Sequence, residues 1–346
     1  MPTLRAVLLS CFVFLAAGTP TWGCSSKQVG VVGSGQDAVT PALQHLAERA
    51  EPGVLGGAVL DLRTGQVWSV NGNVPQPLQS VFKLPLAIYV MHLAENGVLS
   101  LDERVTLTKA DISIFYSPIT DDFDSRQEYT IRELVAANVS NSDNTAADWL
   151  LERVGGPQSL TRYFHDRGLR QFRVDRFERE LQPESVGLPI SAGGMADGES
   201  YREYRASVPV DVRTAGMRRY LADPRDRMSA VDAVQMLAML DAGQLLNPEH
   251  TRELMQILLE TPSGANRLKA GVPDAALVYH KTGTGADVEA LNAATNDIGI
   301  IALPDGRRLA VAAFLSGSSL PAEQRDALIA EVARIADQSA VPVSSQ

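Results

Sequence analysis

Cysteine, lysine and long apolar runs are all scarce in this sequence. The two cysteines, Cys11 and Cys24, lie near the N-terminus, so no disulfide or thiolate metal site can form within the main body of the fold. The 31 Lys and Arg against 41 Asp and Glu give a formal charge of −10, and an acidic surface repels phosphate backbones. We therefore expect no nucleic-acid partner. With 45% hydrophobic residues in 346, the chain can still bury a core and form about two domains.

The single long apolar run is Ala6 to Gly18, which is too short to span a bilayer but suits the core of a secretory signal. We expect residues 1–23 to be a signal peptide and the protein to be exported to the periplasm. The signal peptide could be processed in two ways. One is ordinary cleavage after a small residue, and the other is processing before Cys24, whose preceding residues loosely resemble a lipoprotein box. An acylated Cys24 would anchor the protein to a membrane through a flexible tether, residues 24–39. No later run reaches eighteen apolar residues, so no other membrane segment is expected.

Predicted strands at both ends of the mature chain enclose a helical middle. β-rich patterns and short turns predict strands over Val54 to Leu62, Gln66 to Val70, Val278 to Thr282, Ile298 to Leu303 and Leu309 to Leu315. Apolar periodicity and glycine stops predict helices over Ala42 to Ala50, Ser80 to Asn96, Ile131 to Val139, Thr145 to Val154, Leu160 to Arg167, Ala230 to Ala242, Pro248 to Leu259 and Ala322 to Ala336.

This order predicts an α/β fold in two lobes. Strands joined by short turns favour an antiparallel sheet, and helices from the two chain ends can cover it. The α/β lobe would combine residues 40–75 with 270–340, the all-α lobe would hold residues 76–269, and residues 341–346 would be a tail. A cleft between two lobes is the usual place for a small-molecule site.

Ser80 and Lys83 open the most apolar predicted helix, and their spacing puts the hydroxyl and the amine on one face. A serine hydroxyl is a weak nucleophile until a base accepts its proton, and a buried lysine has a lowered pKa that suits this task. The helix N-terminus adds positive charge where an oxyanion would form. The pair alone is not specific, because an N-cap serine would explain Ser80 equally well.

Two further motifs accompany this pair. Ser142-Asp143-Asn144 lies between predicted helices, where an ordinary capping turn is the alternative, and Lys281-Thr282-Gly283-Thr284 lies on a predicted strand, where a solvated edge lysine is the alternative. Only five lysines occur in the chain, and two of them fall in these motifs in the required order. Together the three motifs are the signature of class A β-lactamases and penicillin-binding proteins.

From about residue 40 to 338 the sequence resembles a class A serine β-lactamase. The resemblance includes Phe115 to Pro118, Gly155 to Pro157 and the run from Arg173 to Leu181. Gln79, the stretch from Thr261 to Lys269, and His280 are most similar to the extended-spectrum branch. The resemblance implies a fold like that of the β-lactamases and DD-peptidases: a five-stranded antiparallel sheet flanked by helices beside an all-α lobe.

The same resemblance implies roles for the site residues. The omega loop, residues 173–182, would carry Glu178 as the base that activates a hydrolytic water, with Gln182 helping to position that water. Ser142 would pass a proton to the leaving nitrogen, and the N–H groups of Ser80 and Thr284 would form the oxyanion hole. The implied catalytic residues are Ser80, Lys83, Ser142 and Glu178, and the implied substrate-binding residues are Tyr116, Asn144, Lys281, Thr282, Gly283 and Thr284.

The sequence departs from the family pattern in four places. Gln182 replaces a usual asparagine, which could slow deacylation, and Arg179 replaces a common proline, so a trans peptide is expected after Glu178. The insertion, residues 183–227, is longer than a normal connection, with a flexible glycine-rich part and an arginine-rich, helix-forming part from Tyr201 to Tyr220. Where many members have a strand arginine this chain has Asn296 and Asp297, which leaves Arg325 as a distant candidate.

The expected reaction is hydrolysis of a β-lactam amide through a serine ester, by a monomer that needs no cofactor. No metal site is expected, because the five histidines show no ligand spacing. A penicillin-binding DD-peptidase shares the three motifs, and a sensor that is acylated once would share them too. Glu178 and sustained turnover distinguish the hydrolase from both.

Overall fold

The computed structural model describes residues 38–121 and 123–339. The predicted signal peptide, Cys24 with nearly all of the predicted tether, and the tail at residues 341–346 lie outside these residues. In the described part of the chain, no helix combines the length and the apolar character that crossing a membrane requires.

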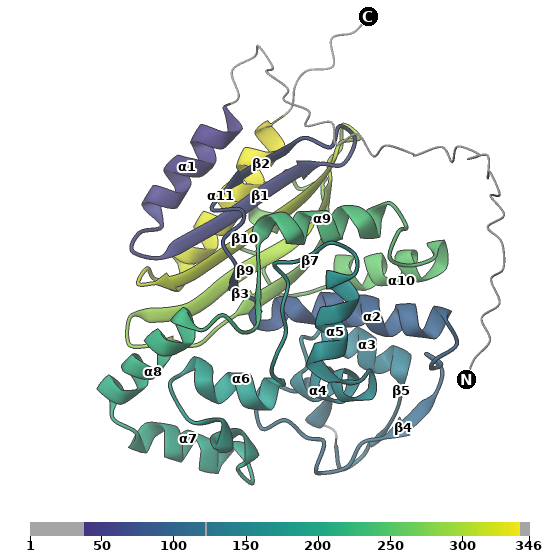
Figure 1. Cartoon of the computed structure of the whole chain (residues 1–346), viewed down its shortest axis with the longest axis vertical. Coiled ribbons are helices and arrows are strands. Elements are labelled where there is room, and N and C mark those ends of the chain that lie inside the picture. The colour runs from purple at the N-terminus through teal and green to yellow at the C-terminus, as the bar shows by residue number, and fades with distance from the viewer. Residues whose placement is uncertain (1–37, 122, 340–346) are drawn as a thin grey trace, which may run out of the picture. The chain divides into compact units, whose positions relative to one another are not determined.

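An antiparallel sheet forms the centre of the α/β part, in the strand order β2-β1-β10-β9-β7 (Figure 1). Five strands were predicted and these five form the continuous order, while the two-residue β8 pairs additionally with β9. The structure places these strands at β1 (Val54–Asp61), β2 (Val67–Val70), β7 (Leu277–Thr284), β8 (Asp287–Val288), β9 (Leu291–Ala302) and β10 (Arg308–Ser318).

Helices from the two chain ends cover one face of the sheet, as predicted (Figure 1). In α1 (Val39–Arg49), Leu43 and Leu46 are buried against the sheet core, and α11 (Ala322–Gln338) contributes a longer apolar stripe beside them. On the opposite face α9 (Ala230–Asp241) packs against β1 and β10. Apolar residues on both faces explain why β9 and β10 are buried along nearly their whole length.

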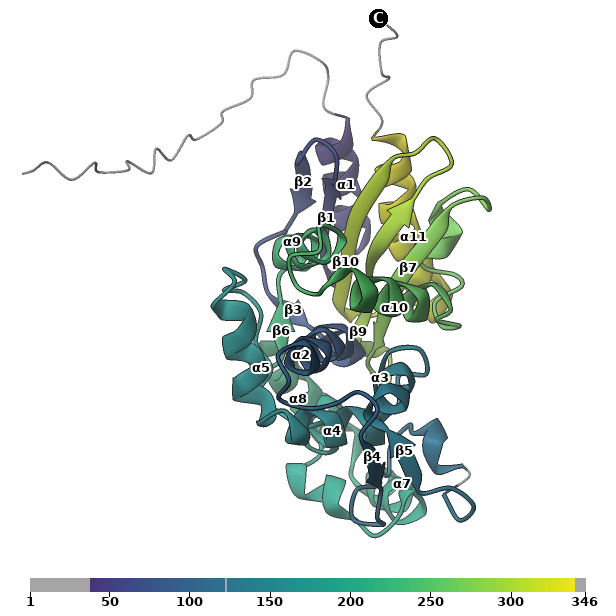
Figure 2. The ribbon, with the colours of Figure 1, turned by 90° about the vertical axis from the view of Figure 1, so that its right-hand side faces the viewer.

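The helical middle packs below the sheet around α2, which is buried on almost every side (Figure 2). Local sequence sets several helix starts: Thr130 and Glu133 form a capping box, and Asp143 accepts the Ala146 N–H. The helices are α2 (Lys83–Glu95), α3 (Ile131–Val139), α4 (Asn144–Arg153), α5 (Gly156–His165) and α10 (Pro248–Leu259). The short strands β4 (Arg104–Thr106) and β5 (Glu128–Thr130) pair at its edge.

The predicted insertion folds into helices that pack on the rest of the molecule. It contains the end of α6 (Glu178–Ser185), a 3-10 turn η3 (Ile190–Gly194), α7 (Gly198–Ser207) and α8 (Val210–Ala222). The prediction of helix over residues 201–220 is therefore confirmed, although a break separates two helices. A third apolar cluster, centred on Tyr201, Met217 and Tyr220, joins these helices to one another and to β8 and β9. The two-residue strands β3 (Gln76–Pro77) and β6 (Arg227–Met228) pair where this segment returns to the core.

Candidate active site

Ser80 lies in a single 3-10 turn, η1 (Gln79–Phe82), and α2 begins only at Lys83. The predicted helix is thus tighter at its start than expected. Gln79 has a φ of 46°, a left-handed conformation that is uncommon for a residue other than glycine. Asn296 stabilises the approach to this turn, because its amide donates to the carbonyls of Pro77 and Leu78 at 2.8 and 3.1 Å.

Lys83 is fully buried and lies where three segments meet. Its Nζ donates to the backbone oxygen of Ser142 at 2.7 Å and to Oδ1 of Asn144. Glu178 Oε1 lies 3.2 Å from the same Nζ, with both side chains out of contact with solvent. A buried ammonium group requires such partners. The structure therefore brings Lys83, the motif at residues 142–144 and Glu178 together.

Ser142 precedes α4 and has a φ of 56°. Its hydroxyl accepts a hydrogen bond from Lys281 Nζ at 3.0 Å. Asp143 holds this turn, because its carboxylate accepts from Ser117 Oγ at 3.0 Å and from the Ile119 N–H at 2.9 Å. Ser142 thus lies between two lysines, one bound to its carbonyl and one to its hydroxyl.

Strand β7 ends the continuous strand order and carries residues Lys281 to Thr284 beside the Ser80 turn. A Cβ at Gly283 would lie 2.6 Å from the Leu78 carbonyl oxygen, so only glycine allows this close approach. Thr282 is buried and bonded to Ser263 at 2.8 Å, whereas Thr284 is exposed at the strand end. An edge strand offers free backbone groups to a ligand.

Lys281 is fully buried on this strand. Burial, and then the neighbouring Lys83 charge, lower the pKa of Lys281 to about 7, while Asp297 and Glu178 act in the opposite direction. Lys281 is therefore a cation whose charge depends on pH near neutrality.

Glu178 is the first residue of α6, and only 1% of its surface is exposed. Gln182, one turn later, donates from Nε2 to Glu178 Oε2 at 2.6 Å. Within the described chain, Glu178 Oε1 makes no hydrogen bond, although the Lys83 charge lies close to it. A buried carboxylate oxygen in this state is an acceptor available to a substrate or a solvent molecule.

Asp148, which the sequence reasoning missed, holds the start of α6. Its carboxylate accepts the backbone N–H groups of Glu178 at 2.6 Å and Arg179 at 3.1 Å. Burial and then the Glu178 charge raise the pKa of Asp148 to about 7. Asp148 lies four residues after Asn144 on α4, so helical spacing could have predicted that both face the site. Among described residues the one cis peptide is Glu51–Pro52, which confirms the expected trans peptide after Glu178.

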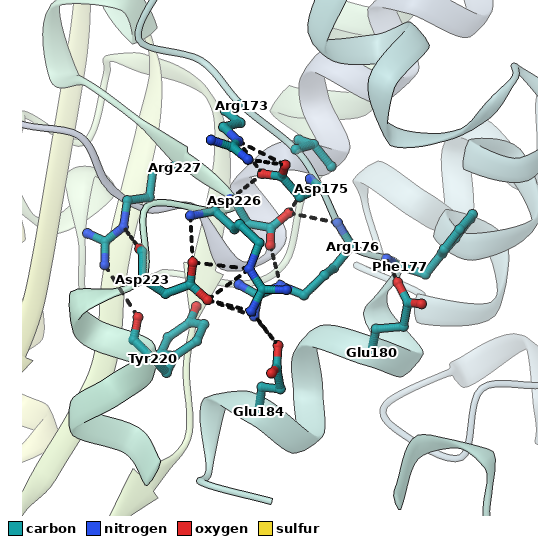
Figure 3. A network of polar contacts seen from close by, with 12 residues as sticks. Arg173, Asp175, Arg176, Phe177, Glu180, Glu184, Tyr220, Asp223, Asp226 and Arg227 are labelled. Carbon is teal, nitrogen blue, oxygen red and sulfur yellow. Dashed lines mark hydrogen bonds and ion pairs between the residues drawn. The ribbon is translucent and has the colours of Figure 1, made fainter. Parts of the chain in front are cut away.

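The segment that carries Glu178 is closed by a buried ion pair (Figure 3). Arg176 Nε donates to Asp226 Oδ2 at 2.5 Å, and its guanidinium also binds Glu184. Asp226 Oδ1 accepts the Arg176 N–H at 3.1 Å and the Asp175 N–H at 2.7 Å. We call residues 177–225, between the two ends of this pair, the enlarged loop.

Arg267 is a second site residue that sequence reasoning missed, because an arginine was sought on the strand after β7. It lies in the loop before η4 (Leu268–Gly271), and its guanidinium donates to Thr284 Oγ1 at 3.0 Å and to the Asn296 carbonyl at 2.9 Å. Arg325, the candidate named from sequence, instead donates to Thr295 at 3.1 Å and pairs with Asp287. The residues next to Arg267 in the sequence gave no indication that its guanidinium contacts Thr284 and Asn296.

Tyr116 lies at the rim of the site, where the residue is 65% exposed. Its carbonyl accepts the Asn144 N–H at 3.1 Å, which ties this rim to α4. Within residues 38–121 and 123–339, no group of histidine and acidic residues could hold a metal ion. His280 instead bonds through Nδ1 to the buried Asp297 at 2.9 Å.

This fold and this set of side chains are those of a serine hydrolase of the β-lactam-recognising kind. The family model described as "Beta-lactamase enzyme family" matches residues 38–340. The chain therefore belongs to the β-lactamase enzyme family and, within it, to the class A serine enzymes.

Individual relatives agree with this assignment. The extended-spectrum β-lactamase PER-1 of Pseudomonas aeruginosa is 31% identical over 76% of this chain and 74% of its own. A β-lactamase structure from Chitinophaga pinensis has a TM-score of 0.72 and 30% identity, covering 87% of this chain and 99% of that one. The reconstructed last common ancestor of Gram-negative class A enzymes has a TM-score of 0.70 and 34% identity, with 87% and 99% covered.

Proposed function

We propose that this protein hydrolyses β-lactam amides through a covalent ester on Ser80, which a Glu178-activated water then cleaves. The observation that carries the proposal is the position of Lys83, whose Nζ lies 2.7 Å from the Ser142 carbonyl and 3.2 Å from Glu178. Ser80 lies in the turn directly before Lys83. The meeting of these three segments at Lys83 supports a shared role for Ser80, Ser142 and Glu178 in one reaction.

In the acylation step Ser80 Oγ attacks the lactam carbonyl carbon. Its proton passes to Glu178 through a water, or directly to Lys83 once that ammonium group has given a proton to Glu178, whose Oε1 lies 3.2 Å from its Nζ. Either route adds the proton to the pair formed by Lys83 and Glu178. The N–H groups of Ser80 and Thr284 stabilise the oxyanion. The C–N bond then breaks, and the Ser142 hydroxyl gives its proton to the ring nitrogen and is reprotonated from the Lys281 and Lys83 side.

In the deacylation step Glu178 takes a proton from water, and the water oxygen attacks the ester carbonyl carbon. The bond to Ser80 Oγ then breaks, and Oγ recovers a proton from the pair formed by Glu178 and Lys83. The buried, hydrogen-bond-free Oε1 of Glu178 supports this role, because that oxygen can still accept. Gln182 supports it too, by fixing the other carboxylate oxygen at 2.6 Å. General-base assistance of this kind is worth about 10²- to 10⁴-fold.

Substrate recognition rests on the β7 edge and the cations behind it. Lys281, Thr282, Gly283 and Thr284 would hold the substrate carboxylate, with Arg267 adding charge through Thr284. Asn144 would bind the acylamido side chain, and Tyr116 would line the entrance. The burial of Lys281 supports this assignment, since a buried cation attracts a carboxylate more strongly than an exposed one.

Steady-state hydrolysis of a chromogenic cephalosporin tests the reaction. We expect many equivalents hydrolysed per protein, no acylation of Ser80→Ala, and a long-lived acyl-enzyme in Glu178→Ala that is visible by mass spectrometry. A stoichiometric burst without steady state would favour the sensor or the penicillin-binding DD-peptidase. Wild-type turnover by Glu178→Ala would refute the water-activating role.

We also propose that the protein works as a monomer after export to the periplasm. The apolar run from Ala6 to Gly18 supports export, and Cys24 offers a lipid anchor if processing occurs before it. Fractionation of cells that express the full chain or Cys24→Ser distinguishes a free from an anchored enzyme. Retention of both forms in the cytoplasm would refute export.

A further inference from the structure

The side chain next to the nucleophile is held by a residue from the enlarged loop. Gln79, only 1% exposed, donates from Nε2 to the Tyr220 hydroxyl oxygen at 2.7 Å. The two residues are 141 positions apart. Within the described chain Gln79 Oε1 has no hydrogen-bond partner, so this single bond orients the side-chain amide. Tyr220 lies on α8, beside the Arg176 and Asp226 pair (Figure 3).

Gln79 needs such support because its backbone is strained. A left-handed φ in a residue with a Cβ is unfavourable and persists only where the surroundings determine it. The torsion angles of Gln79 set the direction of the following peptide, whose N–H belongs to Ser80. Under the proposed function that N–H is one of the two oxyanion donors. A small rotation at Gln79 would therefore misalign a catalytic hydrogen bond.

Tyr220 is itself held firmly enough to support its neighbour. Its side chain is buried, and the Arg176 guanidinium lies 5.5 Å from its ring centroid. Within the enlarged loop, helix α8 packs very closely on the residues that follow α6. A Cβ at Gly216 would lie only 2.3 Å from the Gly187 Cα. Asp226, directly after the enlarged loop, also contacts the segment that leads to Ser80. The Leu78 N–H donates to its carbonyl at 3.0 Å.

From this arrangement we infer that Tyr220 is a positioning residue for the oxyanion hole. Its hydroxyl holds Gln79, and through Gln79 the Ser80 N–H, in the direction that the tetrahedral intermediate requires. The inference rests on the proposed function for the identity of the oxyanion donor. Helix α8 would then take part in the reaction by supporting the nucleophile turn through the contact between Tyr220 and Gln79.

Tyr220→Phe tests the inference, because it removes the hydroxyl and keeps the ring on Arg176. Tyr201→Phe is the matched control, since Tyr201 is buried in the same cluster and packs on Phe115 instead of the nucleophile turn. We expect Tyr220→Phe to lower kcat/KM about tenfold, since an orphaned buried amide then replaces a hydrogen bond. We expect the affinity for phenylboronic acid, which forms a tetrahedral adduct on a serine hydroxyl, to fall by the same factor.

Ground-state binding separates positioning from general damage. In a Ser80→Ala background, where no adduct forms, Tyr220→Phe should leave cephalosporin affinity within about twofold. In a Gln79→Leu background it should cause no further loss of kcat/KM, because the shared contact is already gone. Tyr201→Phe should match the wild type in every assay.

Equal behaviour of Tyr220→Phe and Tyr201→Phe in kcat/KM and boronate affinity would overturn the inference. So would a parallel loss of ground-state binding, or additive effects with Gln79→Leu. The boronate measurement needs no β-lactam turnover. If the wild type binds boronate on Ser80 but hydrolyses no β-lactam, the proposed function fails, while the boronate comparison still decides the role of Tyr220.

Discussion

The two halves of the candidate site are held in place by different forces. Ser80 and Lys83 lie at the start of α2, a helix surrounded by apolar side chains, so packing fixes them. Glu178 begins a short helix made mostly of polar residues. It is held by Asp148 and by the ion pair that closes the enlarged loop. The nucleophile half depends on burial, and the loop half depends on charge.

This difference predicts that the two chemical steps can be separated. Disturbing the charges around the enlarged loop should affect deacylation and stability, whereas the motifs around α2 and β7 should govern substrate binding and acylation. The two halves meet at the contact between Lys83 and Glu178, which neither half forms alone. Tyr220 also reaches from the loop half to the nucleophile half.

The largest effect that tests this comparison is expected at the ion pair between Arg176 and Asp226, which closes the enlarged loop. Asp226→Asn leaves the buried Arg176 charge short of a partner and turns an amide donor towards backbone N–H groups that need an acceptor. Breaking a buried pair costs about 3–5 kcal/mol of stability. Because Glu184 still pairs with Arg176, we expect the free energy of unfolding to fall by about 3 kcal/mol. Urea unfolding measures it.

The control for this variant is Glu128→Gln, which breaks the exposed pair with Arg104 and should cost no more than about 1 kcal/mol. At a temperature where Asp226→Asn is folded, its deacylation rate should fall while its acylation rate stays near the wild-type value. A larger loss in acylation than in deacylation would show that the two halves are not held separately.

A smaller, pH-dependent effect is expected at Lys281 in the nucleophile half. Because burial lowers the pKa of this ammonium group to about 7, Lys281 loses its proton and its charge as the pH rises through that value. A substrate carboxylate binds the charged form, so KM should rise above pH 7 by up to about tenfold per pH unit. The deacylation rate, a property of the loop half, should not follow this rise.

Lys281→Arg supplies the matched comparison, since a guanidinium keeps its proton throughout this range. Its KM should be nearly constant between pH 6 and pH 9, even if its absolute value is higher. KM profiles of both proteins with one cephalosporin decide the point. An equal alkaline rise in Lys281→Arg would assign the titration to another group.

The nucleophile half was predictable from sequence because its information is local. The residue pairs in the three motifs have fixed spacings, and strong apolar periodicity placed α2, α3, α9 and α10 within a few residues of their observed bounds. The 3-10 turn at Ser80 was not foreseen, and its surroundings include a distant strand, whose Gly283 lies close to the Leu78 carbonyl. Side-chain spacing along one helix cannot report such a contact with another strand.

The loop half was less predictable because its contacts join residues far apart in the chain. Asp226 and Tyr220 carry no motif, and their partners Arg176 and Gln79 lie 50 and 141 positions away. Charged residues are common on protein surfaces, so a charge pattern alone does not show which pair becomes buried. The resemblance to a known family pointed to Glu178, but it gave no account of the additional helices α7 and α8.

The finest test of the comparison is Gln182, whose amide touches only the loop half. Gln182→Leu removes the 2.6 Å hydrogen bond to Glu178 Oε2 and leaves that carboxylate with the Lys83 charge as its fixed partner. The freed carboxylate samples more orientations, so we expect deacylation to slow by about tenfold. Acylation, which starts from Ser80, should change less than about twofold.

Quenched-flow mass spectrometry measures both steps, because slower deacylation raises the fraction of acyl-enzyme at steady state. Gln244→Leu, at an exposed position in the turn after α9, is the control and should match the wild type. If Gln182→Leu slowed acylation as much as deacylation, Glu178 would have to act in both steps through this one hydrogen bond. The proton from Ser80 would then reach Glu178 through water, and the two halves would be coupled from the first step of the reaction.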